Sequence, residues 1–204
     1  MSNSKTEFRL VTWEEIHKIC VELYNQMRKD KLKPDLIIGI ARGGWGPARI
    51  LSDLFNDTRV ASIKIEFYTD INKRTKTPKV VQPVSTDVTG KTLILVDDVA
   101  DSGLSLRVAL DHLKERKAQT VRTVTLYYKP WSIVIPDYYA RETRAWLVFA
   151  HEMAEFMRLR MTNREKEGIP LETIRNEFIQ LGIPKFLINF IFEEKLNIIH
   201  KINE

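Results

Sequence analysis

The stretch Leu93–Leu106, LILVDDVADSGLSL, decides the fold of this chain. Its first four residues are an apolar run of the length of a buried strand, and the acidic pair Asp97-Asp98 follows at once. A third acid, Asp101, precedes a Ser-Gly-Leu-Ser turn that leads into a helical pattern of leucines. A strand that turns tightly into a helix presents backbone N–H groups and the positive end of the helix dipole to an anion. The stretch therefore predicts a site for a phosphorylated sugar.

The turn and the acids offer different chemistry. The backbone N–H groups and hydroxyls of Ser102, Gly103 and Ser105 are suited to a phosphate. Asp97 and Asp98 are suited to sugar hydroxyls or a magnesium ion, and Asp101 can handle a proton. An ordinary strand–turn–helix with solvated acids is the alternative interpretation.

A second loop of the same kind lies earlier in the chain. The apolar run 35–40, DLIIGI, predicts a strand of a parallel sheet covered on both faces. It ends in Ala41-Arg42-Gly43-Gly44-Trp45-Gly46-Pro47, and a helix is expected over 48–55. The glycines allow the backbone to approach a ligand closely, and the guanidinium of Arg42 can hold phosphate oxygens in a bidentate fork. A glycine turn with a solvated arginine is the alternative.

Both loops resemble those of one enzyme family. The segment 93–106 resembles the phosphoribosyl pyrophosphate (PRPP) binding motif of type I phosphoribosyltransferases, with Ser102 and Ser105 where Thr is more usual. The Arg42-Gly43-Gly44 segment resembles the family's pyrophosphate loop, which commonly holds a non-proline cis peptide. The resemblance extends over about residues 8–156 and implies an α/β fold, with a mostly parallel sheet, helices on both faces and a small hood.

The resemblance also implies a role for each loop residue. The 5-phosphate would be bound by Asp101, Ser102, Gly103, Leu104 and Ser105. The ribose hydroxyls and Mg²⁺ would be bound by Asp97 and Asp98, with Asp98 as the main metal ligand, and pyrophosphate by Arg42, Gly43 and Gly44. Asp101 would be the catalytic carboxylate near purine N7.

The polar, basic segment 68–78 matches the flexible loop that closes over the active site in this family. Its candidate residues are Lys73, Arg74 and Lys76. A long exposed hairpin is the alternative for this segment.

The order of residues after the predicted strand 121–128 resembles the branch that acts on 6-oxopurines: hypoxanthine, guanine and xanthine. By position, Lys129 would donate to the exocyclic oxygen of the base, Trp146 would stack on its ring, and Leu147 would offer backbone contacts. Glu152 would replace an acid that interacts with the base edge or the metal, a departure from the familiar pattern. Lys129 donates only, which opposes the amino group of adenine. Adenine remains an alternative if Lys129 turns away.

The tail from Met157 on lacks such loops and predicts three helices, 158–167, 171–181 and 185–202. They are separated by two similar breaks, 168–170 and 182–184, each of the form Gly-Ile-Pro. We therefore expect a catalytic core with its hood over 1–157 and a helical extension over 158–204. The apolar tail and the family habit favour a dimer or larger homo-oligomer.

The net charge limits the classes of binding partner. A net charge of +5 over 204 residues suits a polyphosphate substrate or a nucleic acid, but the basic residues form no dense tract. A PRPP-sensing regulator that binds nucleic acid is therefore the less favoured alternative to an enzyme of purine salvage. The sequence shows no signal peptide or membrane-spanning run, and its single cysteine, Cys20, predicts a reducing cytoplasm.

Overall fold

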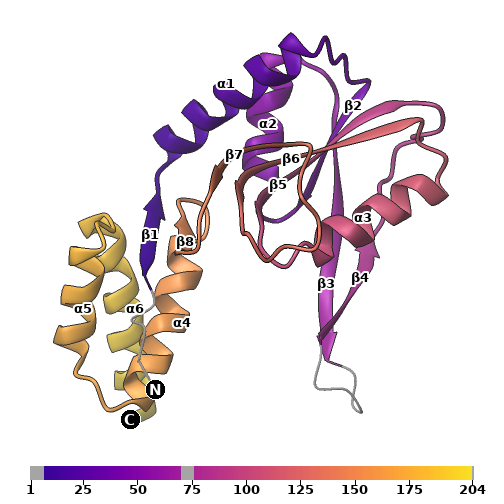
Figure 1. Cartoon of the computed structure of the whole chain (residues 1–204). Coiled ribbons are helices and arrows are strands. Elements are labelled where there is room, and N and C mark those ends of the chain that lie inside the picture. The colour runs from indigo at the N-terminus through magenta and orange to yellow at the C-terminus, as the bar shows by residue number, and fades with distance from the viewer. Residues whose placement is uncertain (1–6, 70–75, 204) are drawn as a thin grey trace. The chain divides into compact units, whose positions relative to one another are not determined.

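The computed structural model describes residues 7–69 and 76–203, and the chain divides into two compact units. The sheet unit is Glu14–Arg144. The helical unit joins the N-terminal segment, up to Trp13, to Ala145–Glu204 (Figure 1). The expected boundary after residue 157 differs from this division, since residues 145–157 group with the helices that follow them.

The sheet unit is built on six strands. They are β2 (Leu36–Ala41), β3 (Val60–Thr69), β4 (Lys76–Gln82), β5 (Thr92–Ala100), β6 (Thr120–Tyr128) and β7 (Tyr138–Glu142). Their order is β4-β3-β2-β5-β6-β7, and every neighbouring pair is parallel except β3 with β4. The sheet is therefore mostly parallel, as predicted, and β2 and β5 lie side by side at its centre.

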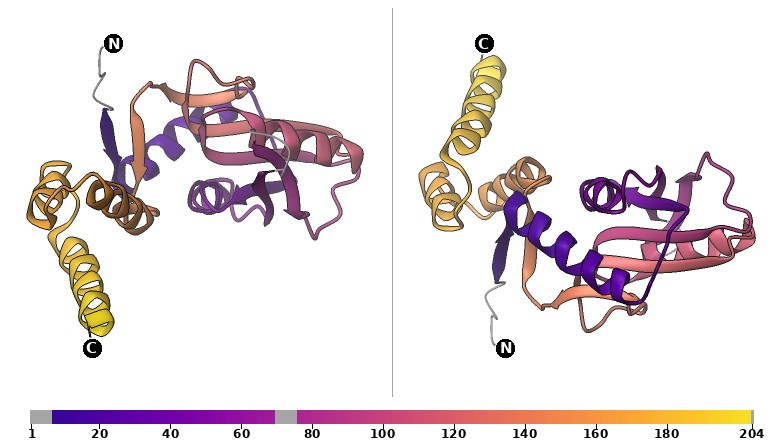
Figure 2. Two further views of the ribbon diagram at one scale, coloured as in Figure 1. Left: turned by 90° about the horizontal axis from the view of Figure 1, so that it is seen from below. Right: turned by 90° about the horizontal axis from the view of Figure 1, so that it is seen from above.

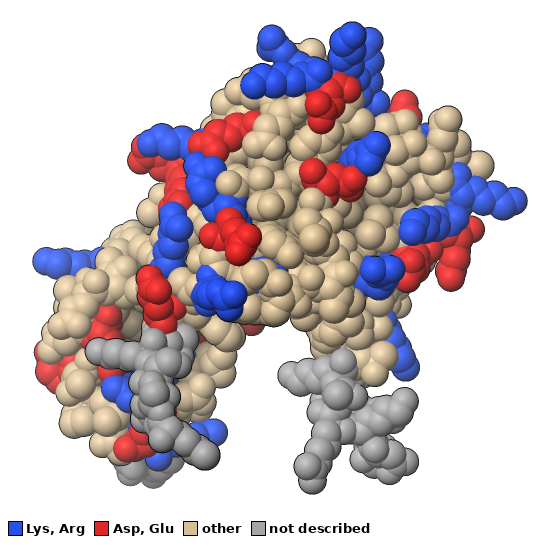
Figure 3. Space-filling model, viewed as in Figure 1, with Lys and Arg blue, Asp and Glu red and all other residues tan. Residues whose placement is uncertain are grey.

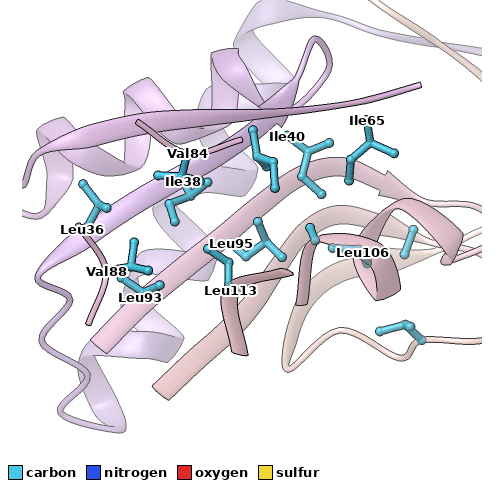
Figure 4. Packing of buried hydrophobic residues seen from close by; sticks show 14 of the residues in the cluster. Leu36, Ile38, Ile40, Ile65, Val84, Val88, Leu93, Leu95, Leu106 and Leu113 are labelled. Carbon is cyan, nitrogen blue, oxygen red and sulfur yellow. The ribbon is translucent and has the colours of Figure 1, made fainter. Parts of the chain in front are cut away.

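Three helices accompany this sheet: α1 (Trp13–Lys29), α2 (Trp45–Leu54) and α3 (Leu104–Glu115). Side chains of a strand alternate between the two faces of a sheet. Leu36, Ile38 and Ile40 of β2 therefore point the same way and join a core with Leu106 and Leu113 of α3 (Figure 4). The helix α2 packs on β2 and β5 from the other face (Figures 1 and 2). Helices thus cover both faces of the sheet, as the sequence predicts.

Polar contacts hold α1 against β6 and β7. The hydroxyl of Tyr127 on β6 donates to Glu15 at 2.6 Å, and Arg141 on β7 pairs with Glu22 at 2.8 Å. The buried face of α1 includes Ile16, Leu23 and other apolar residues, which agrees with the amphipathic pattern.

The helical unit contains a short two-stranded sheet and three helices. The strands β1 (Phe8–Val11) and β8 (Trp146–Phe149) pair in parallel, with Phe8 opposite Trp146. The helices are α4 (Met153–Lys166), α5 (Leu171–Gln180) and α6 (Lys185–Asn203). The predicted breaks are confirmed: Gly168 and Gly182 adopt φ values of +76° and +85°, in the left-handed region that favours glycine.

One apolar core joins the small sheet to the helices. Val148 of β8 packs in a cluster with Met157 of α4, Phe178 of α5 and Ile188 of α6, and Phe8 and Leu10 of β1 lie against it. This shared core is the reason that β1 and β8 group with the C-terminal helices. Among the described residues, no helix is long and apolar enough to cross a membrane.

Several element bounds differ from expectation for local reasons. The helix α2 begins at Trp45 rather than residue 48, because Pro47 falls in the first turn, where its missing N–H costs nothing. The helix α4 begins at Met153 rather than at residue 158. The strands β1 and β7 were not expected, since each is short; β7 is also an edge strand with polar residues.

Candidate active site

The two predicted loops meet because β2 and β5 are parallel neighbours. Gly39 of β2 lies opposite Val96 of β5, so the loop after β2 and the acids after Val96 emerge at the same edge of the sheet. The carboxyl ends of parallel strands are where ligands bind in open α/β sheets. The structure therefore brings Arg42, Gly43 and Gly44 next to the acidic pair.

Asp98 lies directly against the glycine loop. Its side chain is 8% exposed, and its Oδ1 accepts a hydrogen bond from the N–H of Val99 at 2.8 Å. A Cβ atom on Gly43 would overlap the Asp98 carboxylate, and one on Gly44 would overlap the carbonyl oxygen of Val96. Glycine is therefore required at both positions. The expected non-proline cis peptide is present between Ala41 and Arg42.

Asp97 is partly buried and lines a different space from Asp98. It faces a cavity of about 310 Å³ together with Phe67, Asp101, Ser102 and Ser105. Burial raises the pKa of Asp97 well above its usual value, and the adjacent Asp98 charge adds to that rise. Side chains of successive strand residues point to opposite faces of the sheet, so Asp97 faces the cavity whereas Asp98 lies against the glycine loop.

The turn at the start of α3 forms one wall of the cavity. Gly103 has φ +77°, and the N–H of Leu104 donates to Ser102 Oγ at 3.3 Å. The next N–H groups of α3 belong to its first turn, which has no intrahelical acceptor, so they are available to an anion. The segment behind the turn fixes it: the N–H of Ile133 donates to the Ser102 carbonyl at 3.0 Å, and a Cβ on Gly103 would overlap Ser132 Oγ.

Asp101 and Lys129 are connected through a tryptophan. The indole Nε1–H of Trp131 donates to Asp101 Oδ1 at 2.8 Å, and Lys129 Nζ lies 5.5 Å from the Trp131 ring centroid. Lys129 is 5% exposed, and its backbone N–H donates to Ala100 at the end of β5. Burial lowers the pKa of Lys129, while the Asp101 charge acts in the opposite direction.

Comparison with known proteins agrees with this geometry. The family model of the phosphoribosyl transferase domain matches residues 10–155. The chain belongs to the phosphoribosyl transferase family. The predictions of family, fold class and enzyme class are therefore confirmed, and the reaction class is the transfer of a ribosyl phosphate group.

This phosphoribosyl transferase is similar to several purine phosphoribosyltransferases. A purine phosphoribosyltransferase from Pyrococcus horikoshii is 35% identical, with a TM-score of 0.65, over 71% of this chain and 93% of that one. A xanthine-guanine enzyme from Idiomarina loihiensis is 29% identical, over 74% of this chain and 90% of its own. A hypoxanthine-guanine enzyme from Staphylococcus aureus is 29% identical, over 59% of this chain and 69% of its own.

The predicted base-binding residues of this phosphoribosyl transferase are divided between the two units. Lys129 belongs to the sheet unit, whereas Trp146, Leu147 and Glu152 belong to the helical unit. Trp146 is 55% exposed, so its ring is available to a ligand, while Leu147 is buried. The Glu152 side chain turns toward the end of β8, where its Oε1 accepts from the backbone N–H of Phe149 at 3.2 Å. Their roles in base binding remain predictions.

The donors at the strand ends fit a magnesium ion. Asp97 and Asp98 supply carboxylate oxygens, which Mg²⁺ prefers, and the described residues contain no cluster of three His, Cys, Asp or Glu side chains. Mg²⁺ usually keeps several waters and binds through one or two carboxylates plus substrate phosphates. The residues therefore suit a metal that enters with a polyphosphate.

Two residues of this phosphoribosyl transferase site were not predicted from the sequence. Phe67 of β3 lines the cavity, and Trp131 holds Asp101. A single exposed aromatic carries no periodic signal, and both contacts depend on strands or loops distant in the chain. Of the flexible-loop candidates, Lys73 and Arg74 lie outside the described residues, and Lys76 is the first residue of β4.

Proposed function

We propose that this phosphoribosyl transferase moves ribose 5-phosphate from PRPP to a purine base, as an enzyme of purine salvage. The observation that carries this is the pairing of two loops on adjacent strands: a glycine loop against buried Asp98, and a helix-start turn beside Asp97 and Asp101. The relatives named as purine enzymes support the choice of acceptor.

In the proposed reaction, the bond from ribose C1 to a pyrophosphate oxygen breaks, a bond from C1 to a base nitrogen forms, and the base loses a proton. The turn Ser102–Ser105 would anchor the 5-phosphate at the start of α3. Arg42 and the amides of Gly43 and Gly44 would hold the departing pyrophosphate, and Asp101 would accept or steer the proton near N7.

Asp97 and Asp98 would hold the ribose hydroxyls in this scheme, with Asp98 as the main ligand of Mg²⁺. When bound, Mg²⁺ would neutralise charge that develops on the pyrophosphate. The protein's own contribution would be orientation: the Val99 N–H orients Asp98, Gly43 leaves room for its carboxylate, and the Trp131 hydrogen bond orients Asp101.

For the base, we propose a 6-oxopurine such as hypoxanthine, guanine or xanthine. Lys129 is buried at the end of β6, and a charged ammonium group only donates, which suits an exocyclic oxygen. The named relatives act on bases of this kind.

The test measures nucleotide formation from PRPP and Mg²⁺ with adenine, hypoxanthine, guanine, xanthine, uracil and orotate offered separately. Turnover of the oxopurines alone would support the Lys129 donor role, and Lys129→Ala should then raise KM for the base. Turnover of adenine alone would overturn that role while leaving the PRPP site intact. Lack of turnover with every base, with PRPP still bound, would favour a PRPP-sensing regulator.

We also propose an oligomeric state and a cellular compartment for the protein. Phe186 and Phe190 of α6 are 75% and 58% exposed, which favours a homo-oligomer that sedimentation would detect. We place the protein in the cytoplasm, where Cys20 would remain a thiol; its burial raises the pKa of that thiol to about 12 and keeps it unreactive.

A further inference from the structure

A second cavity lies at the opposite edge of the sheet from the acidic loops. Its volume is about 420 Å³, within the range of small-molecule sites. Its walls come from the end of α1, from the connection to β2 and from the segment between α2 and β3. These segments precede the first residues of β2 and β3, so the cavity is at the amino-terminal edge of the sheet, away from the Asp97–Ser105 site.

Three cations line this cavity: Arg28, Lys31 and Lys33. Their side chains form no hydrogen bond or ion pair with the described part of the chain. No described carboxylate lines the cavity: Asp30 accepts from the Tyr138 hydroxyl and Asp35 from the N–H of Thr92, while Asp57 lies between two lining residues without lining the cavity itself. Figure 3 shows Lys and Arg side chains gathered at this end of the sheet unit. The lining itself therefore carries three positive charges and no negative charge.

Two aromatic rings form the apolar part of the same cavity. Tyr24 of α1 and Phe55, which follows α2, meet edge to face with their centroids 4.9 Å apart. Aromatic rings beside cations bind ligands that combine a flat ring with negative charge. Basic residues also occur in the last turns of helices, where they balance the dipole, and Arg28 lies in the last turn of α1. Lys31 and Lys33 follow the helix and line the same cavity, so the positive charge extends beyond the helix end.

We propose that this cavity is a second ligand site, which binds a nucleotide: an aromatic base on the Tyr24 and Phe55 rings and phosphates on Arg28, Lys31 and Lys33. The site is separate from the proposed catalytic centre and contains none of its residues. Its chemistry fits a nucleoside di- or triphosphate, because the three cations can bind several phosphate charges and the cavity has the volume of a small-molecule site.

Lys31 allows a sharp variant with a matched control. Its φ is +56°, and Asn tolerates this left-handed conformation well, so Lys31→Asn removes the charge without straining the backbone. Lys117 has φ +61° in the corresponding position after α3 and does not line the cavity. Lys117→Asn therefore repeats the same chemical change outside the site.

The experiment titrates ATP into the full chain by calorimetry, with PRPP and Mg²⁺ in excess to occupy the catalytic site. We expect Arg28→Gln/Lys31→Asn/Lys33→Gln to weaken ATP binding at least tenfold, and Lys117→Asn to bind ATP like the original chain. Equal binding by the triple variant and the original chain would overturn the proposal. Tripolyphosphate and adenosine should each bind at least tenfold more weakly than ATP.

Further outcomes of the experiment test the separate parts of the proposal. If tripolyphosphate matches ATP, the aromatic half of the proposal is wrong; if single-stranded DNA displaces ATP with higher affinity, the site serves nucleic acid instead. The triple variant should keep the original turnover rate. Absence of turnover in the original chain would contradict the proposed catalytic function alone, since ATP binding is measured independently.

Discussion

The two units of this chain use their buried positions differently. At the strand ends of the sheet unit, Asp98 and Lys129 are 8% and 5% exposed, although burial of charge costs stability. In the helical unit, the buried positions are filled by methionine, isoleucine and phenylalanine, and charges such as Glu177 pair at partly exposed sites. The contrast teaches that the sheet unit keeps polar groups buried where the proposed site lies, whereas the buried positions of the helical unit contribute to stability alone.

The largest effect is expected in the core of the helical unit. Phe178 is 1% exposed and meets Phe156 and Phe192 edge to face. Phe178→Ala should lower the free energy of unfolding by about 3–5 kcal/mol, because it removes apolar burial and leaves a cavity. Leu159→Ala, at a site 58% exposed on α4, is the control and should change it by less than about 0.5 kcal/mol in urea unfolding. Equal losses in both would contradict the assigned core.

In the sheet unit, Asp97→Asn should separate activity from stability. Loss of a charged contact to the transition state lowers kcat/KM by roughly 10²–10³-fold. The pKa of Asp97 is raised in the folded chain, so its stabilising contribution is present at acid pH and is lost as the pH rises through that pKa. The variant should therefore melt at a higher temperature than the original chain at neutral pH, with no gain at acid pH. A lower melting temperature at neutral pH would contradict this interpretation.

Gly43→Ala should damage the site through geometry. The added Cβ would overlap the Asp98 carboxylate, and a displacement of that order costs about 10²-fold in kcat/KM. Gly90→Ala is the control: Gly90 has φ +69° and open space around it, so this variant loses stability through backbone strain but keeps its activity. Comparable activity in both variants would show that the Gly43–Asp98 contact is unimportant for turnover.

A smaller effect is expected at Trp131, as a positioning residue for Asp101. Trp131→Phe removes the N–H that donates to Asp101 Oδ1 and keeps an aromatic ring. We expect kcat to fall about tenfold, by about 1.4 kcal/mol, with KM for PRPP unchanged. Trp13→Phe, at a similarly exposed tryptophan, should leave kcat unaltered. A change in KM alone would indicate a role in binding instead.

The smallest effect is expected at Glu177, which pairs with both Arg160 and Arg164. All three side chains are partly exposed, so Glu177→Gln should cost at most about 1 kcal/mol of unfolding free energy. The loss should shrink in high salt, as screening predicts. A loss that persists in 1 M salt would point to a packing defect.

The sequence alone was enough to single out the two loops that the structure brings together. The turn after β5 and the loop after β2 each combine an apolar strand, glycines and charged residues within a few positions, so each loop can be recognised in one stretch. The Asp101–Trp131 hydrogen bond and the approach of Gly43 to Asp98 join separate stretches and required the structure. No periodic signal marks such contacts.

The same limit explains the missed elements. The edge strand β7 reads YYARE, without the apolar run that identifies a buried strand, because only one neighbour pairs with it. The strand β1 has four residues, too few for a pattern, and its partner β8 is far away in the chain. The grouping of β1 and β8 with the C-terminal helices was invisible for that reason.

The pairing of Phe8 with Trp146 also sets an order of events during synthesis. The first strand leaves the ribosome early, yet its only neighbour in the small sheet is made more than a hundred residues later. At roughly 5–20 residues per second, β1 waits about 7–28 s for that partner. The sheet unit, whose strands all lie in between, can fold during this interval. The helical unit is thus completed last, when translation delivers β8 and the helices that cover it.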